Sequence, residues 1–128
     1  MKFRLVDSIF DGGQYPFLKY MHDNVSKLEI CLSIEEGVDA TIMFSTYVAY
    51  QKRRDMDTVV ASESWEGIEG PGIYAVDGGD YRIYFSSGGL FTRDDMIHYA
   101  VLTDDESIDV LSYAAPIITR SNFTNAEK

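Results

Sequence analysis

Apolar and polar residues alternate with a period of two along much of the chain, which is typical of half-buried β-strands. Residues 27–35 show this most clearly: four aliphatic side chains fall on one face of an extended chain, and Glu29, Cys31 and Ser33 fall on the other. The segment therefore predicts a strand with one buried face. Cys31 is expected to be a small residue of the core or of the sheet face.

The middle of the chain predicts further strands. Residues 40–51 are rich in β-branched and aromatic side chains, which fit a pleated surface, and their number predicts one long strand. Residues 52–57 are polar and predict a break. The cations of "QKRR" (51–54) are expected at a solvated hairpin end, and a contact with the chain's own acidic surface is the alternative. Residues 58–65 are then expected to return as the next strand.

A hairpin is predicted over residues 73–85. Two β-rich runs, 73–76 and 81–85, are joined by Asp77-Gly78-Gly79-Asp80. Glycine supplies the positive φ that tight hairpin turns require, and aspartate is a common neighbour there. The two aspartates are expected to keep an exposed turn solvated.

Residues 92–102 fit two interpretations. Thr92 stands three residues before Asp95, which is a helix-start signature, but the same letters also alternate as a strand. We favour a strand over 97–102, because it would pair with 108–115 as a hairpin.

Strand-like runs with turn signals every ~8–12 residues predict a mostly β fold. We expect an antiparallel β-sandwich or barrel of about seven to nine strands, with room for one short helix. Residues 17–21 fit either a helical turn or a short strand. The chain is expected to form a single domain over 1–128, with 119–128 as a polar, flexible tail.

The overall charge excludes some partners. The chain has 128 residues and a net charge of −10, which disfavours binding to nucleic-acid phosphates or to anionic lipid. Its single cysteine cannot form an internal disulfide, and neither a signal peptide nor an apolar run of ~20 residues stands out. A cytoplasmic location is the expectation.

The charge is concentrated in one part of the sequence. Residues 55–109 hold thirteen acidic residues against Arg82 and Arg93, while the rest of the chain is close to neutral. Aromatic residues interleave with the carboxylates, and Trp65 stands between Glu63 and Glu66. A one-signed surface of this kind attracts cationic partners, and Trp and Tyr are common interface anchors.

Metal chemistry is weakly indicated. Asp77 and Asp80 supply two carboxylates where Ca²⁺ needs about six ligands, even if a neighbouring loop added Asp104, Asp105 and Glu106. We therefore expect no metal and no cofactor at this turn.

The soft ligands and nucleophiles are sparse. His22, Cys31 and His98 are far apart in the sequence and match no zinc spacing. Cys31 with His98 is the only thiol–imidazole pair that the chain could assemble, and no serine lies in a nucleophile elbow. We expect a protein that is not an enzyme.

One stretch resembles a known family. The segments "DGGDYRIYFSSGG" (77–89) and "MIHYAVLTDD" (96–105) resemble nuclease inhibitors of the competence-protein-J type and related bacterial immunity proteins. The best match is Gly79-Asp80-Tyr81-Arg82, and the likeness covers about a quarter of the chain. The resemblance implies an inhibitor that binds a basic nuclease, with no catalytic residue to carry over.

These observations lead to a functional hypothesis. The protein is expected to be an acidic immunity protein that neutralises a basic toxin or nuclease by capping its cleft with carboxylates. The alternatives are a structural or accessory β-sandwich subunit, or a module that binds a small ligand or carbohydrate. The residues expected at the partner interface are Glu63, Trp65, Glu66, Asp77, Asp80, Asp104, Asp105, Glu106 and Asp109.

Overall fold

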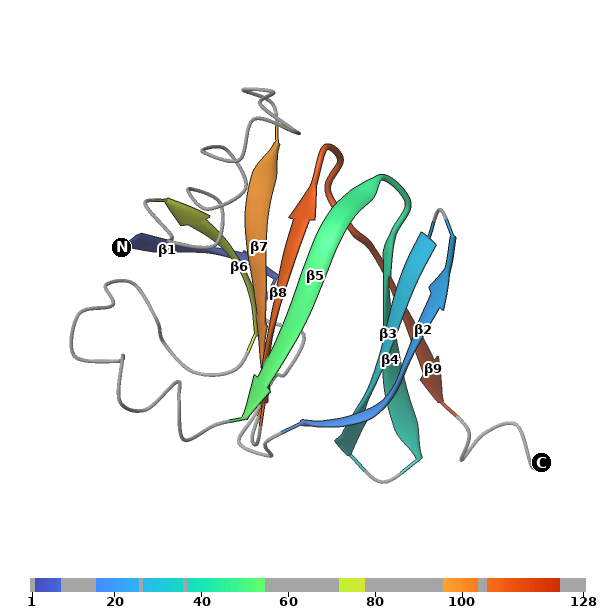
Figure 1. The fold of residues 1–128 in the computed structure, drawn as a ribbon. Coiled ribbons are helices and arrows are strands. Elements are labelled where there is room, and N and C mark those ends of the chain that lie inside the picture. The colour runs from blue at the N-terminus through green and yellow to red at the C-terminus, as the bar shows by residue number, and fades with distance from the viewer. Residues whose placement is uncertain are drawn as a thin grey trace.

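The protein is an all-β structure in the part of the chain that can be described. A computed structural model describes residues 2–7, 16–25, 27–35, 37–54, 72–77, 96–103 and 106–122. These residues form nine strands in two antiparallel sheets and contain no helix (Figure 1). The predicted β-sandwich class is confirmed.

The first sheet has five strands in the order β1-β6-β7-β8-β5, and each neighbouring pair is antiparallel. Its strands are β1 (Lys2–Asp7), β6 (Gly72–Asp77), β7 (Ile97–Leu102), β8 (Glu106–Ser112) and β5 (Tyr47–Arg54).

The second sheet has four strands in the order β2-β3-β4-β9, again all antiparallel. Its strands are β2 (Phe17–Asn24), β3 (Lys27–Glu35), β4 (Val38–Phe44) and β9 (Ile117–Asn122).

The main core lies between the two sheets. The period-two pattern turns one face of each strand inward, so that the aliphatic side chains of β3 and β4 pack against those of β7 and β8. The ring of Phe44 from the second sheet lies 5.5 Å from that of Tyr99 in the first, measured between centroids. The buried residues of this core are Leu28, Ile30, Leu32, Ala40, Ile42, Phe44, Ile73, Tyr99, Val101, Ile108 and Val110.

The first sheet is buried on its outer face as well. Phe3, Tyr74, Val76, Ala100 and Leu102 form a second cluster there, and each is at most 7% exposed. β6, β7 and β8 are accordingly buried at almost every position, whereas a strand with one wet face alternates.

The predicted long strand over 40–51 is wrong in one respect. Ser45 and Thr46 carry the chain from β4 in the second sheet to β5 in the first. The Thr46 carbonyl accepts a hydrogen bond from Tyr113 N–H at 3.3 Å, so the crossing lies against the chain that leaves β8. Apolar and polar residues alternate both before and after such a crossing. The sequence pattern therefore does not show that the chain changes sheets here.

The predicted break at residue 52 is also displaced. β5 continues to Arg54, because Lys52 and Arg53 find carboxylates on β8, Glu106 and Asp109. The returning strand predicted at 58–65 lies outside the described residues.

The first run of the hairpin predicted over 73–85 is confirmed as a strand. Residues 73–76 lie in β6 as expected, but β6 pairs with β1 on one edge and with β7 on the other. Val76, for example, stands between Phe3 and His98. Both hydrogen-bonding edges of β6 are thus occupied by β1 and β7. The turn and the second run of the predicted hairpin, 78–85, lie outside the described residues.

Three further expectations have clear outcomes. Residues 97–102 form a strand that pairs with β8, as favoured. Residues 17–21 belong to a strand, β2. The tail predicted from residue 119 is wrong over 119–122, because β9 pairs residue for residue with β4. Backbone hydrogen bonding to a neighbouring strand holds this polar segment, which side-chain polarity alone does not indicate.

Candidate functional site

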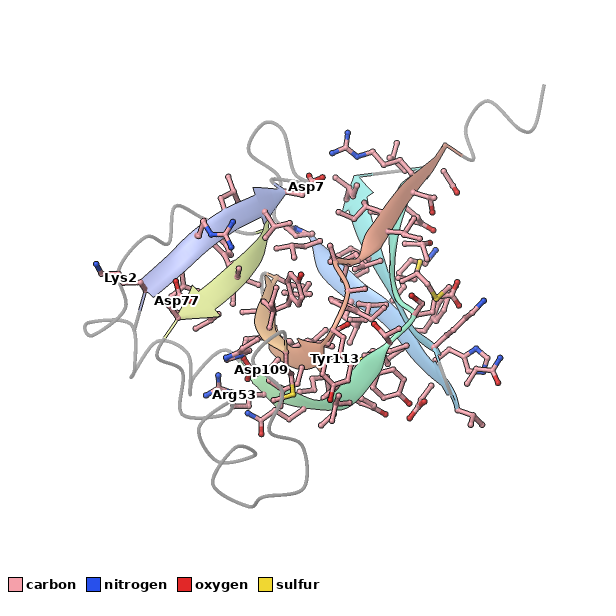
Figure 2. The ribbon with its side chains drawn as sticks, turned by 90° about the horizontal axis from the view of Figure 1, so that it is seen from above. Lys2, Asp7, Arg53, Asp77, Asp109 and Tyr113 are labelled. Carbon is pink, nitrogen blue, oxygen red and sulfur yellow. The ribbon has the colours of Figure 1, made fainter. Side chains whose placement is uncertain are left out.

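A cluster of polar side chains lies on the outer face of the first sheet. Gln51 on β5 stands directly opposite Asp109 on β8, and His98 on β7 lies on the other side of that carboxylate. Neighbouring strands project directly opposed residues to the same face, which brings these groups together. Arg53 joins from β5, and Figure 2 shows its side chain close to Asp109.

Asp109 is the centre of this cluster. Its Oδ1 lies 2.7 Å from His98 Nε2, and its Oδ2 lies 3.0 Å from both Gln51 Nε2 and an Arg53 terminal nitrogen. The residue is only 2% exposed. A buried carboxylate without partners costs several kcal/mol, so these contacts are what allow Asp109 to remain within a buried strand.

The electrostatics keep Asp109 ionised. Burial by itself would raise the pKa of this carboxyl, but the hydrogen bond and charge of His98, the hydrogen bond from Gln51 and the charge of Arg53 together lower the pKa below its usual value. An ionised carboxylate only accepts hydrogen bonds, so the Nε2 of His98 carries the hydrogen in this contact. Asp109 thus fixes the orientation of the imidazole.

The geometry of the His98–Asp109 pair can be compared with what acid–base catalysis requires. An aspartate that orients a histidine can support acid–base catalysis, but the reacting group must come within hydrogen-bond reach of the imidazole. His98 is 4% exposed. The cluster therefore acts as a buried ionic tie that joins β5, β7 and β8.

Asp109 does not suit the role that the sequence suggested for it. We expected it among the carboxylates that face a partner, whereas its oxygens are buried and engaged within the sheet. The cations of "QKRR" were expected at a solvated hairpin end or in contact with the chain's own acidic residues, and the second alternative describes Lys52 and Arg53. The signal that could have found the cluster is a single carboxylate within the apolar run 108–118, which needs a buried partner.

Two other predicted interface residues lie at opposite ends of the first sheet. Glu106 begins β8 and lies 3.3 Å from Lys52 Nζ. Asp77 ends β6, is exposed and stands opposite Lys2. Figure 2 shows Lys2 and Asp77 together at one end of β1 and β6 and Asp7 at the other.

The strand register defines these two ends. Arg54 pairs with Glu106, and Gly72 pairs with Leu102, so we call this the Arg54 end. Segment 55–71 joins Arg54 to Gly72, and the β7–β8 connection with Asp104 and Asp105 leaves from the same end. The opposite end, which we call the Asp77 end, is where segment 78–95 departs from β6. The remaining predicted residues, Glu63, Trp65, Glu66, Asp80, Asp104 and Asp105, lie outside the described residues.

The other predicted constellations are not brought together. Cys31 alternates with the core residues of β3, and His98 alternates with those of β7, so the two lie on the outer faces of different sheets. They cannot form a thiol–imidazole pair. Within the described ranges no group of three metal-ligating side chains occurs, and no helix there is long and apolar enough to cross a membrane.

Comparison of the chain with protein-family models, with curated proteins and with solved structures gave no match.

Proposed function

We propose that this protein is an acidic inhibitor of the immunity-protein type, which binds a basic toxin or nuclease in the cytoplasm and covers its cleft with carboxylates. The observation that carries the proposal is how charge divides between the sandwich and the segments that join its strands. The described residues include eight basic and eight acidic side chains, and the remaining residues include three basic and thirteen acidic ones. The whole net charge of −10 thus belongs to the connecting and terminal segments.

The strand topology shows at which end of the first sheet the acidic segments attach. Segments 55–71 and 104–105, which both attach at the Arg54 end, contain seven acidic residues and no basic residue. Segment 78–95, which attaches at the Asp77 end, contains three acidic and two basic residues. The Arg54 end is therefore the part of the sandwich from which the acidic segments depart.

Two of the three basic residues that directly precede segment 55–71 are engaged within the sheet. Lys52 pairs with Glu106 at 3.3 Å, and Arg53 pairs with Asp109 at 3.0 Å. Carboxylates of β8 therefore neutralise two of the three cations in 52–54. The acidic residues of 55–71 and 104–105 are left as an excess that a basic partner would neutralise.

Such an excess acts chiefly on the rate of encounter. Each exposed ion pair contributes roughly 0.2–1 kcal/mol, but a one-signed surface raises association rates from ~10⁵–10⁶ to as much as ~10⁸–10⁹ M⁻¹s⁻¹ at low salt. A basic active-site cleft that normally binds phosphates would also bind a surface of this kind, because carboxylates, like phosphates, are negatively charged.

Affinity capture with matched variants tests the proposal. The wild type, the reversal Asp104→Lys/Asp105→Lys/Glu106→Lys at the Arg54 end, and the reversal Asp77→Lys/Asp94→Lys/Asp95→Lys are immobilised separately. Both variants change the net charge equally, and the second changes the Asp77 end. We expect a basic protein to bind the wild type and the Asp77-end variant and to be lost from the Arg54-end variant.

The captured protein is then purified and its toxic or nuclease activity is titrated with the wild type. Stoichiometric loss of activity supports the proposal. Capture of no basic protein, or capture without inhibition, contradicts it.

A further inference from the structure

The sheet edges are not alike. Four described strands end a sheet: β1, β5, β2 and β9. An open edge can pair with a strand of another molecule, and proteins prevent this with β-bulges and with charged side chains. β1, β2 and β5 each show a register shift against their neighbour, at Val6, Lys19 and Val48, and each carries two or more charged residues.

β9 is the least protected of these four edges. Its pairing with β4 runs without a shift from Asn122 to Ile117, and Arg120 is its only charged residue. Ile117 is 63% exposed, and Thr119 is exposed on the same face. Among the described strands β9 pairs with β4 alone, so it is the flat, lightly charged margin of the second sheet (Figure 1).

We propose that β9 pairs antiparallel with β9 of a second copy of this chain, so that the two four-stranded sheets become one continuous sheet. A twofold axis between identical strands places one residue opposite itself. With the axis at Thr119, threonine faces threonine and Arg120 faces Ile118 of the second copy. With the axis at Arg120, two arginines would face each other, which like-charge repulsion disfavours.

The charge distribution also favours a second copy as the partner. The net charge of −10 opposes association in general, but β9 carries no carboxylate, and the described sandwich is balanced. The sheets can therefore approach along this edge with less repulsion than along the Arg54 end. Pairing through Thr119 would also continue the existing row in which Thr41 stands opposite Thr119.

The extent of the edge limits the affinity. With the axis at Thr119, five residues of β9 from each copy pair with one another, 117–121, and they form a smaller contact than the ~1,000 Å² that a stable interface usually buries. The dimer is therefore weak, forms at high concentration and is strengthened by salt, because salt screens the repulsion between two acidic molecules.

Sedimentation velocity over a wide range of protein concentration, at low and high salt, tests this pairing. The wild type is expected to shift from monomer to dimer as concentration and salt rise. Thr119→Lys and Thr119→Glu each place like charges opposite one another and should weaken the dimer about fivefold. Ser45→Lys, at an exposed position in the β4–β5 crossing, is the control and should dimerise as the wild type does.

An equal mixture of the Thr119→Lys and Thr119→Glu proteins tests the register. It should form a heterodimer more readily than either variant forms a homodimer, because position 119 faces itself only if the axis passes through it. A wild type that remains monomeric at every concentration and salt would overturn the proposal. So would a dimer that both charged variants leave unchanged.

Discussion

His98 Nε2 lies 2.7 Å from Asp109 Oδ1. Both side chains are buried on the outer face of the first sheet, where they project from the neighbouring strands β7 and β8. Asp109 thus carries a negative charge within a strand that is buried at almost every position. This charge is tolerable only because Gln51 and Arg53 bind the second carboxylate oxygen. The stability of the sheet should therefore be sensitive to this carboxylate.

Asp109→Asn should destabilise the fold by about 3 kcal/mol, because it leaves Arg53 and His98 beside a neutral group. Glu106→Gln is the matched control on the same strand, and it should cost less than about 1 kcal/mol, since its partner Lys52 is half exposed. Urea denaturation of both variants measures the difference. Equal losses would contradict the special role of Asp109.

The same carboxylate predicts a dependence of stability on pH. The folded protein holds the pKa of Asp109 below the usual value of 3.8, so the unfolded chain takes up the proton first as the pH falls. The stabilisation that ionised Asp109 contributes is fully present above pH 3.8, the usual pKa. It is lost as the pH falls below this value and through the lower pKa of the folded state. The free-energy gap between the wild type and Asp109→Asn should therefore be constant near neutrality and close below about pH 3.8. A gap that stays constant down to acid unfolding would contradict this.

A different contact joins the edge strands of the two sheets. The Tyr47 hydroxyl on β5 donates a hydrogen bond to Asp23 on β2, and this bond, with smaller effects of burial and charge, raises the pKa of Tyr47 to about 12. The contribution to stability is present below pH 10 and is lost as the pH rises toward 12. Asp23→Asn should return the phenol toward its ordinary value, whereas Asp7→Asn, at the end of β1, should not. Titration of the tyrosine ring carbons by NMR, with Tyr47→Phe for assignment, measures the shift.

Gly72 is required where β6 begins. Its φ is +156°, and an added Cβ would lie 3.1 Å from the Asp7 carbonyl oxygen and 3.2 Å from a Leu5 methyl carbon. Gly72→Ala should cost about 1–3 kcal/mol. Adding Leu5→Ala should recover little of that loss, because the contact with the Asp7 backbone remains. Full recovery in the double variant, measured by thermal or urea unfolding, would show that the side-chain contact alone was responsible.

The sequence pattern predicted elements better than connections. The alternation in 27–35 predicts a strand because it marks a buried face, and 97–102 is favoured as a strand because it alternates and has a hairpin partner at 108–115. The β6 partner could not be predicted this way: "DGGD" favours a local hairpin, while the actual neighbours, β1 and β7, come from distant parts of the chain. Burial on both faces of β6 decides the outcome, and short-range turn chemistry does not report it.

The site was less predictable than the fold. The sequence alone does not show whether an aspartate such as Asp109 faces solvent or a buried histidine. The register of β5, β7 and β8 decides between these two environments. Charge segregation, in contrast, is visible in the sequence. What the structure adds is that segments 55–71 and 104–105 depart from the same end of one sheet.

The most direct test of the proposed function is the association rate with the captured basic partner, measured by stopped flow at low and high salt. The wild type and the Asp77-end reversal should associate fast at low salt and markedly more slowly at high salt, since the screening length falls to roughly 3 Å at 1 M. The Arg54-end reversal should associate slowly at both salts. An association rate that ignores salt, or that falls equally for both reversals, would contradict an inhibitor whose acidic surface lies at the Arg54 end.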